Sequence, residues 1–94
     1  MSDLTLVNTP EWAAVIKRLI RSEMALHEVT YSELSRRLAH QFHIQQTESN
    51  LKAKINKGVL GAQLFIQILC VLGTSNLNLD QARELHSELT QAKT

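Results

Sequence analysis

Apolar residues recur every three or four positions in five stretches of this chain, which is the spacing that places side chains on one face of an α-helix. Residues that begin or end helices mark the limits of these stretches, since Thr or Asn precedes four of them and Gly follows two. A chain of 94 residues has room for one domain. We predict an all-α protein, a compact five-helix bundle, with residues 1–9 as an N-terminal arm and residues 10–94 as a single helical domain.

The stretch from Thr30 to Gly73 organises the chain, because three short helical patterns follow one another there. The first begins with Thr30 and Glu33 at capping-box spacing, in which the hydroxyl accepts one backbone amide and the carboxylate reaches back to another. Its stripe that should face the core is Leu34, Leu38 and Phe42. The connection that follows is long, so either this helix runs a turn longer or a loop folds Phe42 and Ile44 back onto the core.

The second pattern predicts a helix over residues 48–57, with Thr47 as its N-cap and Gly58 as its end. Leu51 and Ile55 are four residues apart and should point inward together. The remaining faces of this helix are polar and are therefore free to meet a partner.

The third pattern, residues 62–72, has only two Gln among apolar residues and is too apolar all round for a surface helix. Cys70 within it is predicted to be a small core residue, since a lone Cys cannot form an internal disulfide. We interpret the three patterns together as a helix-turn-helix followed by a supporting helix.

Two further helices flank this unit. The N-terminal helix starts at Thr9 and Pro10, a strong helix entry, and carries Trp12, which together with Tyr31 should anchor the edge of the core. The last helix, residues 79–91, has a narrow apolar stripe that either closes the core or meets a second copy of the chain.

Charge is unevenly distributed, although the net charge is only +1. Residues 12–61 hold eight Lys or Arg against four Glu, whereas the rest of the chain holds two basic against five acidic residues. The positive surplus therefore lies on the helices that would meet an anion such as nucleic acid. No apolar run approaches the roughly 20 residues that cross a membrane, and no secretory leader is evident, so we expect a cytoplasmic protein without a membrane partner.

Other chemistry finds little support in the sequence. His40 and His43 are three residues apart and could reach one metal, but no Cys or third His is near them, so solvated imidazoles are expected instead. There is no Ser/His/Asp or Cys/His arrangement with a supporting motif and no glycine-rich phosphate loop. The sequence therefore predicts neither an enzyme nor a cofactor or metal site.

Two segments are similar to known helix-turn-helix domains. From Thr30 the run T-x-x-E-L-S-x-x-L resembles the second helix of lambda-repressor-like (Cro/repressor, XRE-type) domains, and FIQILCVLG, residues 65–73, resembles the helix that ends them. This resemblance covers about residues 10–75, and Tyr31 stands where those repressors usually carry Gln. NLKAKINKGVLGAQLF beside TYSELSRRL is also similar to a bacterial domain of unknown function found in short proteins.

The resemblance to repressors implies a DNA-binding regulator of transcription that inserts the helix of residues 48–57 into the major groove of double-stranded DNA. Asn50 would then read a base, with Ser49 and Glu48 beside it. Contacts to the DNA backbone would come from Tyr31, Arg36, Arg37, Lys52, Lys54 and Lys57. A homodimer through the C-terminal helix, residues 79–91, would bind two half-sites.

A second hypothesis keeps the same fold without DNA binding. In this case the protein is an interaction module that grips an amphipathic partner helix around residues 62–72 or around the last helix. The modest net charge and the Tyr in place of Gln at residue 31 favour it.

Overall fold

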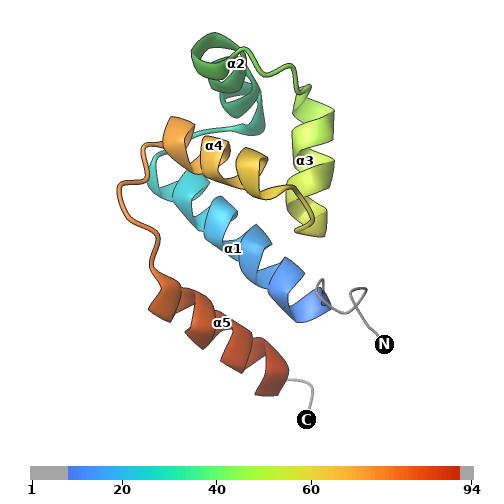
Figure 1. Cartoon of the computed structure of the whole chain (residues 1–94), viewed down its shortest axis with the longest axis vertical. Coiled ribbons are helices and arrows are strands. Elements are labelled where there is room, and N and C mark those ends of the chain that lie inside the picture. The colour runs from blue at the N-terminus through green and yellow to red at the C-terminus, as the bar shows by residue number, and fades with distance from the viewer. Residues whose placement is uncertain (1–8, 92–94) are drawn as a thin grey trace.

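Five α-helices make up all the regular structure in residues 9–91, the part of the chain that the computed structural model describes (Figure 1). The helices are α1 (Pro10–Leu26), α2 (Tyr31–Phe42), α3 (Glu48–Lys57), α4 (Ala62–Leu72) and α5 (Leu79–Gln91). The prediction of an all-α protein with five helices is therefore confirmed. The expected N-terminal arm lies outside the described residues, except for Thr9.

Side-chain caps explain why four helices begin where they do. The Oγ1 atoms of Thr9, Thr30 and Thr47 accept backbone N–H groups at the starts of α1, α2 and α3, at 3.3, 3.1 and 3.0 Å. Asn78 Oδ1 accepts the N–H of Gln81 at 2.9 Å at the start of α5. Each cap satisfies one of the backbone donors that a helix N-terminus leaves without a partner.

Helix α1 lies in the middle of the molecule, with α5 along one side and α2, α3 and α4 on the other (Figure 1). Helix α3 contacts both α1 and α2, and α4 also packs against α1 and α2. Helix α5 contacts α1 and no other helix of residues 9–91. No single helix in this range has the length and apolar composition to cross a membrane. Helices α3 and α4 have that length and composition only when they are taken together, and the chain bends by 113° between them.

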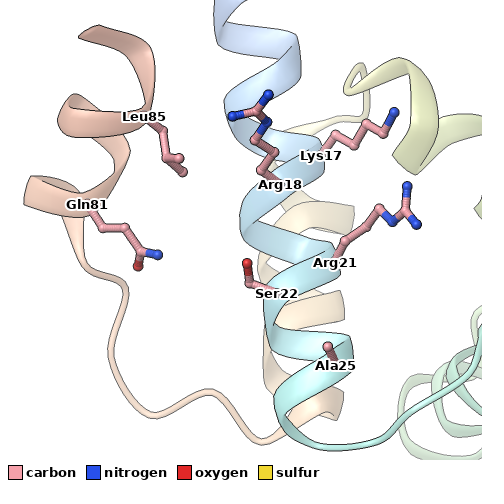
Figure 2. A pocket seen from close by; sticks show the side chains of 7 residues that line it. All are labelled: Lys17, Arg18, Arg21, Ser22, Ala25, Gln81 and Leu85. Atoms are coloured by element: carbon pink, nitrogen blue, oxygen red, sulfur yellow. The ribbon is translucent and has the colours of Figure 1, made fainter. Parts of the chain in front are cut away.

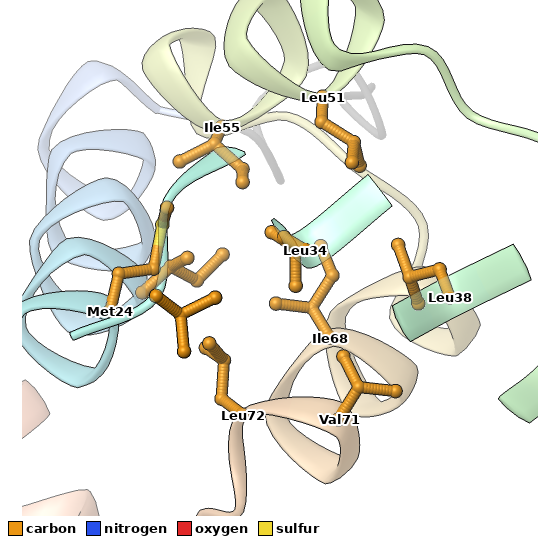
Figure 3. Packing of buried hydrophobic residues seen from close by; sticks show 10 residues of the cluster. Met24, Leu34, Leu38, Leu51, Ile55, Ile68, Val71 and Leu72 are labelled. Carbon is orange, nitrogen blue, oxygen red and sulfur yellow. The ribbon is translucent and has the colours of Figure 1, made fainter. Parts of the chain in front are cut away.

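The large core is the cluster of buried apolar side chains that α1 to α4 share. Its members are Ile20, Met24, Val29, Leu34, Leu38, Leu51, Ile55, Ile68, Val71 and Leu72, most of them shown in Figure 3. Removing a side chain of this size from water is worth about 1.5–3 kcal/mol, so this cluster supplies most of the stability of the fold.

The small core lies between α1 and α5. Val15, Leu19 and Ala82 are buried there, with Leu85 and Leu89 packed against them. The sequence left two alternatives for the apolar stripe of the last helix, core closure or contact with a second copy. Core closure describes Ala82, Leu85 and Leu89, because these residues pack against α1. At the end of the same contact Trp12 stacks on His86, with ring centroids 4.2 Å apart.

Gly58 determines how closely α3 approaches α1. It ends α3 with a φ of +68°, in the left-handed region, and it is buried. A Cβ atom at this position would lie 1.9 Å from the backbone oxygen of Ala13 in α1. The missing side chain therefore lets α3 dock directly against the α1 backbone.

Two predictions about the core are wrong. Phe42 is 41% exposed, because α2 ends there and His43 turns the chain through the left-handed region, which brings Ile44 onto the large core instead. Cys70 is also exposed. Helix α4 buries Ile68, Leu69, Val71 and Leu72, so Ile66 and Cys70, four residues apart, share its outer face.

The sequence left two alternatives for the connection after α2, a longer helix or a loop that folds back, and the structure shows part of both. Helix α2 does run on to Phe42, and the following loop does bring Ile44 onto the core. Tyr31 packs against the large core as predicted. Trp12 is 40% exposed and stacks on His86 of α5, so among the described residues it lies at the α1–α5 contact and not in the large core.

Candidate nucleic-acid interface

Helix α3 is held by two side chains and exposes most of the others. Leu51 and Ile55 are fully buried, on one stripe of the helix. The predicted base-reading residues Glu48, Ser49 and Asn50 and the predicted phosphate contacts Lys52 and Lys57 are all exposed. The structure thus places these five side chains on the open surface of one helix, where they are available to a partner.

Lys54 is placed differently from the other two lysines of α3. It is half-buried, and its Nζ donates a hydrogen bond to Oε1 of Gln46 at 3.2 Å. The backbone oxygen of Gln46 accepts the hydroxyl of Ser35 in α2 at 2.6 Å. Lys54 and Ser35 therefore hold the connection between α2 and α3 from both sides.

The N-termini of α2 and α3 meet at a shallow hollow of about 350 Å³. Its lining includes Tyr31 at the start of α2, Glu48 at the start of α3 and Arg21 from α1. Two residues that the sequence suggested as separate contacts are therefore neighbours, and a cation from α1 joins them. A guanidinium beside the positive ends of two helix dipoles favours an anion in this neighbourhood.

Arg36 and Arg37 are both engaged by Glu33. Arg36 Nε and Arg37 Nε donate to the Glu33 carboxylate at 3.1 and 3.0 Å, and a second Arg36 nitrogen completes a bidentate pair. The hydrogen bonds from Arg36 and then Arg37 lower the pKa of the Glu33 carboxyl from 4.5 to about 2. The same pairing raises the pKa of Arg36. The predicted capping box is therefore incomplete, since the carboxylate serves the arginines and not the backbone amide of Thr30.

Arg37 has a second contact that makes it part of the fold. Its Nη1 donates to the backbone oxygen of Val71 at 2.9 Å, in the last turn of α4. The Arg37 side chain is 32% exposed, whereas that of Arg36 is 67% exposed. Of the two predicted phosphate contacts on α2, only Arg36 stands free enough to reach a partner.

Sequence reasoning counted three cations of α1 in the positive surplus but assigned them no contact with a partner. Lys17, Arg18 and Arg21, called the basic row below, line a groove of about 590 Å³ between α1 and α5 (Figure 2). Within residues 9–91, no ion pair joins these side chains to a carboxylate. The signal was present in the sequence, because none of the three has an Asp or Glu three or four positions away.

Metal chemistry finds no site in the part of the chain that the structure describes. No group of three or more His, Cys, Asp or Glu side chains lies close enough there to hold a metal ion. The polar residues of the hollow and of the groove are cations, an amide and hydroxyls, with Glu48 as the one carboxylate among them, and the rest of the lining is apolar. Such a set suits binding of an anion.

A family described as "Domain of unknown function (DUF6471)" matches residues 12–77 of this chain. Searches of curated proteins and of solved structures give no match. The matched residues run from α1 to the end of the loop after α4, so they contain the whole large core, α3 and the basic row, and they leave out α5. The match covers well over half of the sequence and agrees with the resemblance to a domain of unknown function, and the chain therefore belongs to the DUF6471 family.

Proposed function

We propose that this protein is a cytoplasmic transcription regulator that binds double-stranded DNA through a lambda-repressor-like helix-turn-helix. In this proposal α2 and α3 form the helix-turn-helix and α3 is the recognition helix. The observation that carries it is the contrast along α3, where Leu51 and Ile55 are fully buried while the polar and basic side chains around them are exposed.

The geometry of α3 suits insertion into a groove. The major groove of B-DNA is about 12 Å wide and admits one helix with its side chains. Helix α3 is fixed to α1 and α2 through one stripe, so a recognition surface on its outer side is rigid before binding. A preorganised surface loses little conformational entropy when it binds.

The proposed contacts divide into base readers and backbone contacts. Asn50 is proposed to pair with adenine, because an amide can donate and accept at the same base edge. Ser49 and Glu48 lie beside it at the N-terminus of α3. The proposed backbone contacts are Lys52, Lys57, Arg36 and Tyr31, with Lys54 and Arg37 as supports that keep the connection and α4 in place.

Specific recognition by so small a domain requires two copies on two half-sites. A homodimer through α5 remains part of the proposal. Ala82, Leu85 and Leu89 pack on α1, so a second copy would have to use the other apolar residues near the start of α5, of which Leu79 is 59% exposed.

The test is selection of duplexes from a random library, followed by fluorescence anisotropy on the selected duplex and on a scrambled one, at salt from about 50 to 200 mM. Asn50→Ala should lose about 1–3 kcal/mol on the selected duplex and little on the scrambled one. Lys57→Ala should weaken binding to both and lower the salt slope by about one. Ser75→Ala, in the exposed connection between α4 and α5, is the control and should leave both unchanged. No binding of any duplex at the lowest salt would sink the proposal.

A second candidate function follows from the surface of α4. Val59 and Ile66 are 55% and 52% exposed, and no charged residue occurs between Lys57 and Asp80. An uncharged surface with exposed aliphatic side chains favours an amphipathic protein partner. Under this alternative the titration shows no DNA binding, and Ile66→Glu abolishes the protein interaction instead.

A further inference from the structure

We propose that the basic row of α1, Lys17, Arg18 and Arg21, binds the DNA backbone beside the groove that α3 enters. The inference rests on the proposed function and extends it to a surface that neither the family match nor the repressor resemblance assigns. It starts from a difference among the cations of this chain.

Carboxylates neutralise the arginines on α2 and α5 but not the cations on α1. Arg36 and Arg37 pair with Glu33, and Arg83 pairs with Asp80. The three residues of the basic row have no such partner in the described range. Unpaired cations on one helix raise the local positive potential, and they bind an external phosphate without first breaking an internal ion pair.

The position of Arg21 connects the basic row with α3. Arg21 lines the α1–α5 groove and also the hollow where Tyr31 and Glu48 mark the N-termini of α2 and α3. In Figure 2, Lys17 and Arg21 extend from α1 away from α5, toward the side where α3 lies. When α3 enters the major groove of a duplex, the DNA backbone beside it would therefore lie nearest to Arg21, and Lys17 would be the next cation along it.

The spacing of the row fits a polyanion. Lys17 and Arg21 are four residues apart, about 6 Å along the helix axis, so both lie on one face of α1 one turn apart. Their side chains are long and flexible enough to meet different phosphates of one strand. Arg18 lies beside them and faces the groove shared with α5.

The opposite wall of the groove does not neutralise the row. The α5 residues that line it are Gln81 and Leu85, and the remaining lining residues Ser22 and Ala25 are uncharged too. An amide and a hydroxyl can each donate to a phosphate oxygen. An acidic peptide is the competing occupant of such a groove, and it is one outcome of the test.

The experiment measures salt-dependent DNA binding of the full chain with Lys17→Gln and Arg21→Gln combined. Fluorescence anisotropy is recorded on the selected and the scrambled duplex between about 50 and 200 mM salt. We expect weaker binding to both duplexes by the same factor, and a plot of log K against log salt that is less steep by about two, one for each lost phosphate contact. Asn50→Ala, in contrast, should reduce the preference between the duplexes and keep the slope.

Controls separate failure of this inference from failure of the proposed function. If the wild type binds no duplex, the proposed function fails. If the wild type binds and the double variant has the same affinity and slope, the basic row is not a phosphate site while the proposed function stands. The charge-preserving Lys17→Arg and Arg21→Lys variant should keep the slope, and circular dichroism checks that each variant is folded. Tighter binding of poly-glutamate than of DNA with equal charge, abolished in the double variant, would assign the row to an acidic peptide and overturn the inference.

Discussion

The large core and the small core differ in how many helices they join. Ten buried side chains from α1 to α4 and the turn before α2 meet in the large core, whereas the small core has three buried residues and joins only α1 and α5. The family match ends before α5 and so coincides with the extent of the large core. Helices α1 to α4 therefore form the main structural unit of this chain, and α5 packs on it through one side of α1.

Helix α1 belongs to both cores, which explains its unusual composition. Ile20 and Met24 face the large core, and Val15 and Leu19 face the small one. A surface between these two sides remains for polar residues, and the basic row lies there. The cations are therefore gathered along a line by the packing of α1 on two partners.

Breaking the large core at its tightest point should have the largest effect. Gly58→Ala would place a Cβ 1.9 Å from the Ala13 oxygen and 2.5 Å from its carbonyl carbon, both backbone atoms that cannot rotate away. We expect a loss of about 4 kcal/mol or more, a large part of the total stability of a small domain. Urea denaturation followed by circular dichroism measures it.

The other two glycines are matched controls for Gly58. Gly73 also has a positive φ, of +86°, but a Cβ there would meet only a His27 side-chain atom at 3.9 Å, so Gly73→Ala should cost about 1–2 kcal/mol of backbone strain. Gly61 has nothing within 4 Å, and Gly61→Ala should leave stability nearly unchanged. Equal losses at Gly58 and Gly73 would contradict the close approach of α3 to α1.

Truncating one side chain in each core tests the contrast directly. Leu34→Ala should lower the free energy of unfolding by about 3 kcal/mol, because it leaves a cavity in a fully buried site. Leu85→Ala should cost about 1 kcal/mol or less, because Leu85 is only partly buried and the removed atoms already contact solvent. Similar losses in urea denaturation would mean that α5 is as integral to the fold as α2.

We expect the smallest effects on stability from the ion pairs of Glu33 on α2 and Asp80 on α5. The depressed pKa of Glu33 means that its pairing stabilises the fold fully above about pH 4.5, and that this contribution fades as pH falls toward about 2. Glu33→Gln should therefore lower the melting temperature at pH 7, and the difference from wild type should shrink progressively below pH 4.5. Asp80→Asn on α5 should change little at either pH, since Asp80 and Arg83 are both highly exposed. A difference at Glu33 that stays constant down to pH 2 would refute this account.

Local signals in the sequence predict the helices of this protein well. Thr9, Thr30, Thr47 and Asn78 each act on the backbone three residues ahead, and Gly58 and Gly73 stop the helices that they follow. Such interactions span few residues and depend little on tertiary structure. The inward positions of Leu51 and Ile55, and with them the open face of α3, also follow from periodicity alone.

Features that depend on distant residues were not predictable in this way. Arg37 donates a hydrogen bond to Val71, which lies 34 positions further along the chain, and Gly58 at the end of α3 packs against the backbone of Ala13 in α1. Cys70 lies in a strongly apolar helix, yet the rotation of α4 against α1 and α2 turns it outward. Hydrophobic periodicity gives the direction of a stripe but not how far its edges are covered, which only packing decides.

The stack of Trp12 on His86 also offers an optical consequence. Trp12 is the single tryptophan of the chain, and its ring lies against α5 rather than inside the large core. Its fluorescence emission therefore responds when α5 separates from α1, even while the other four helices stay assembled. The protein carries a natural reporter for the detachment of its last helix, which can be timed in stopped-flow experiments without any added dye.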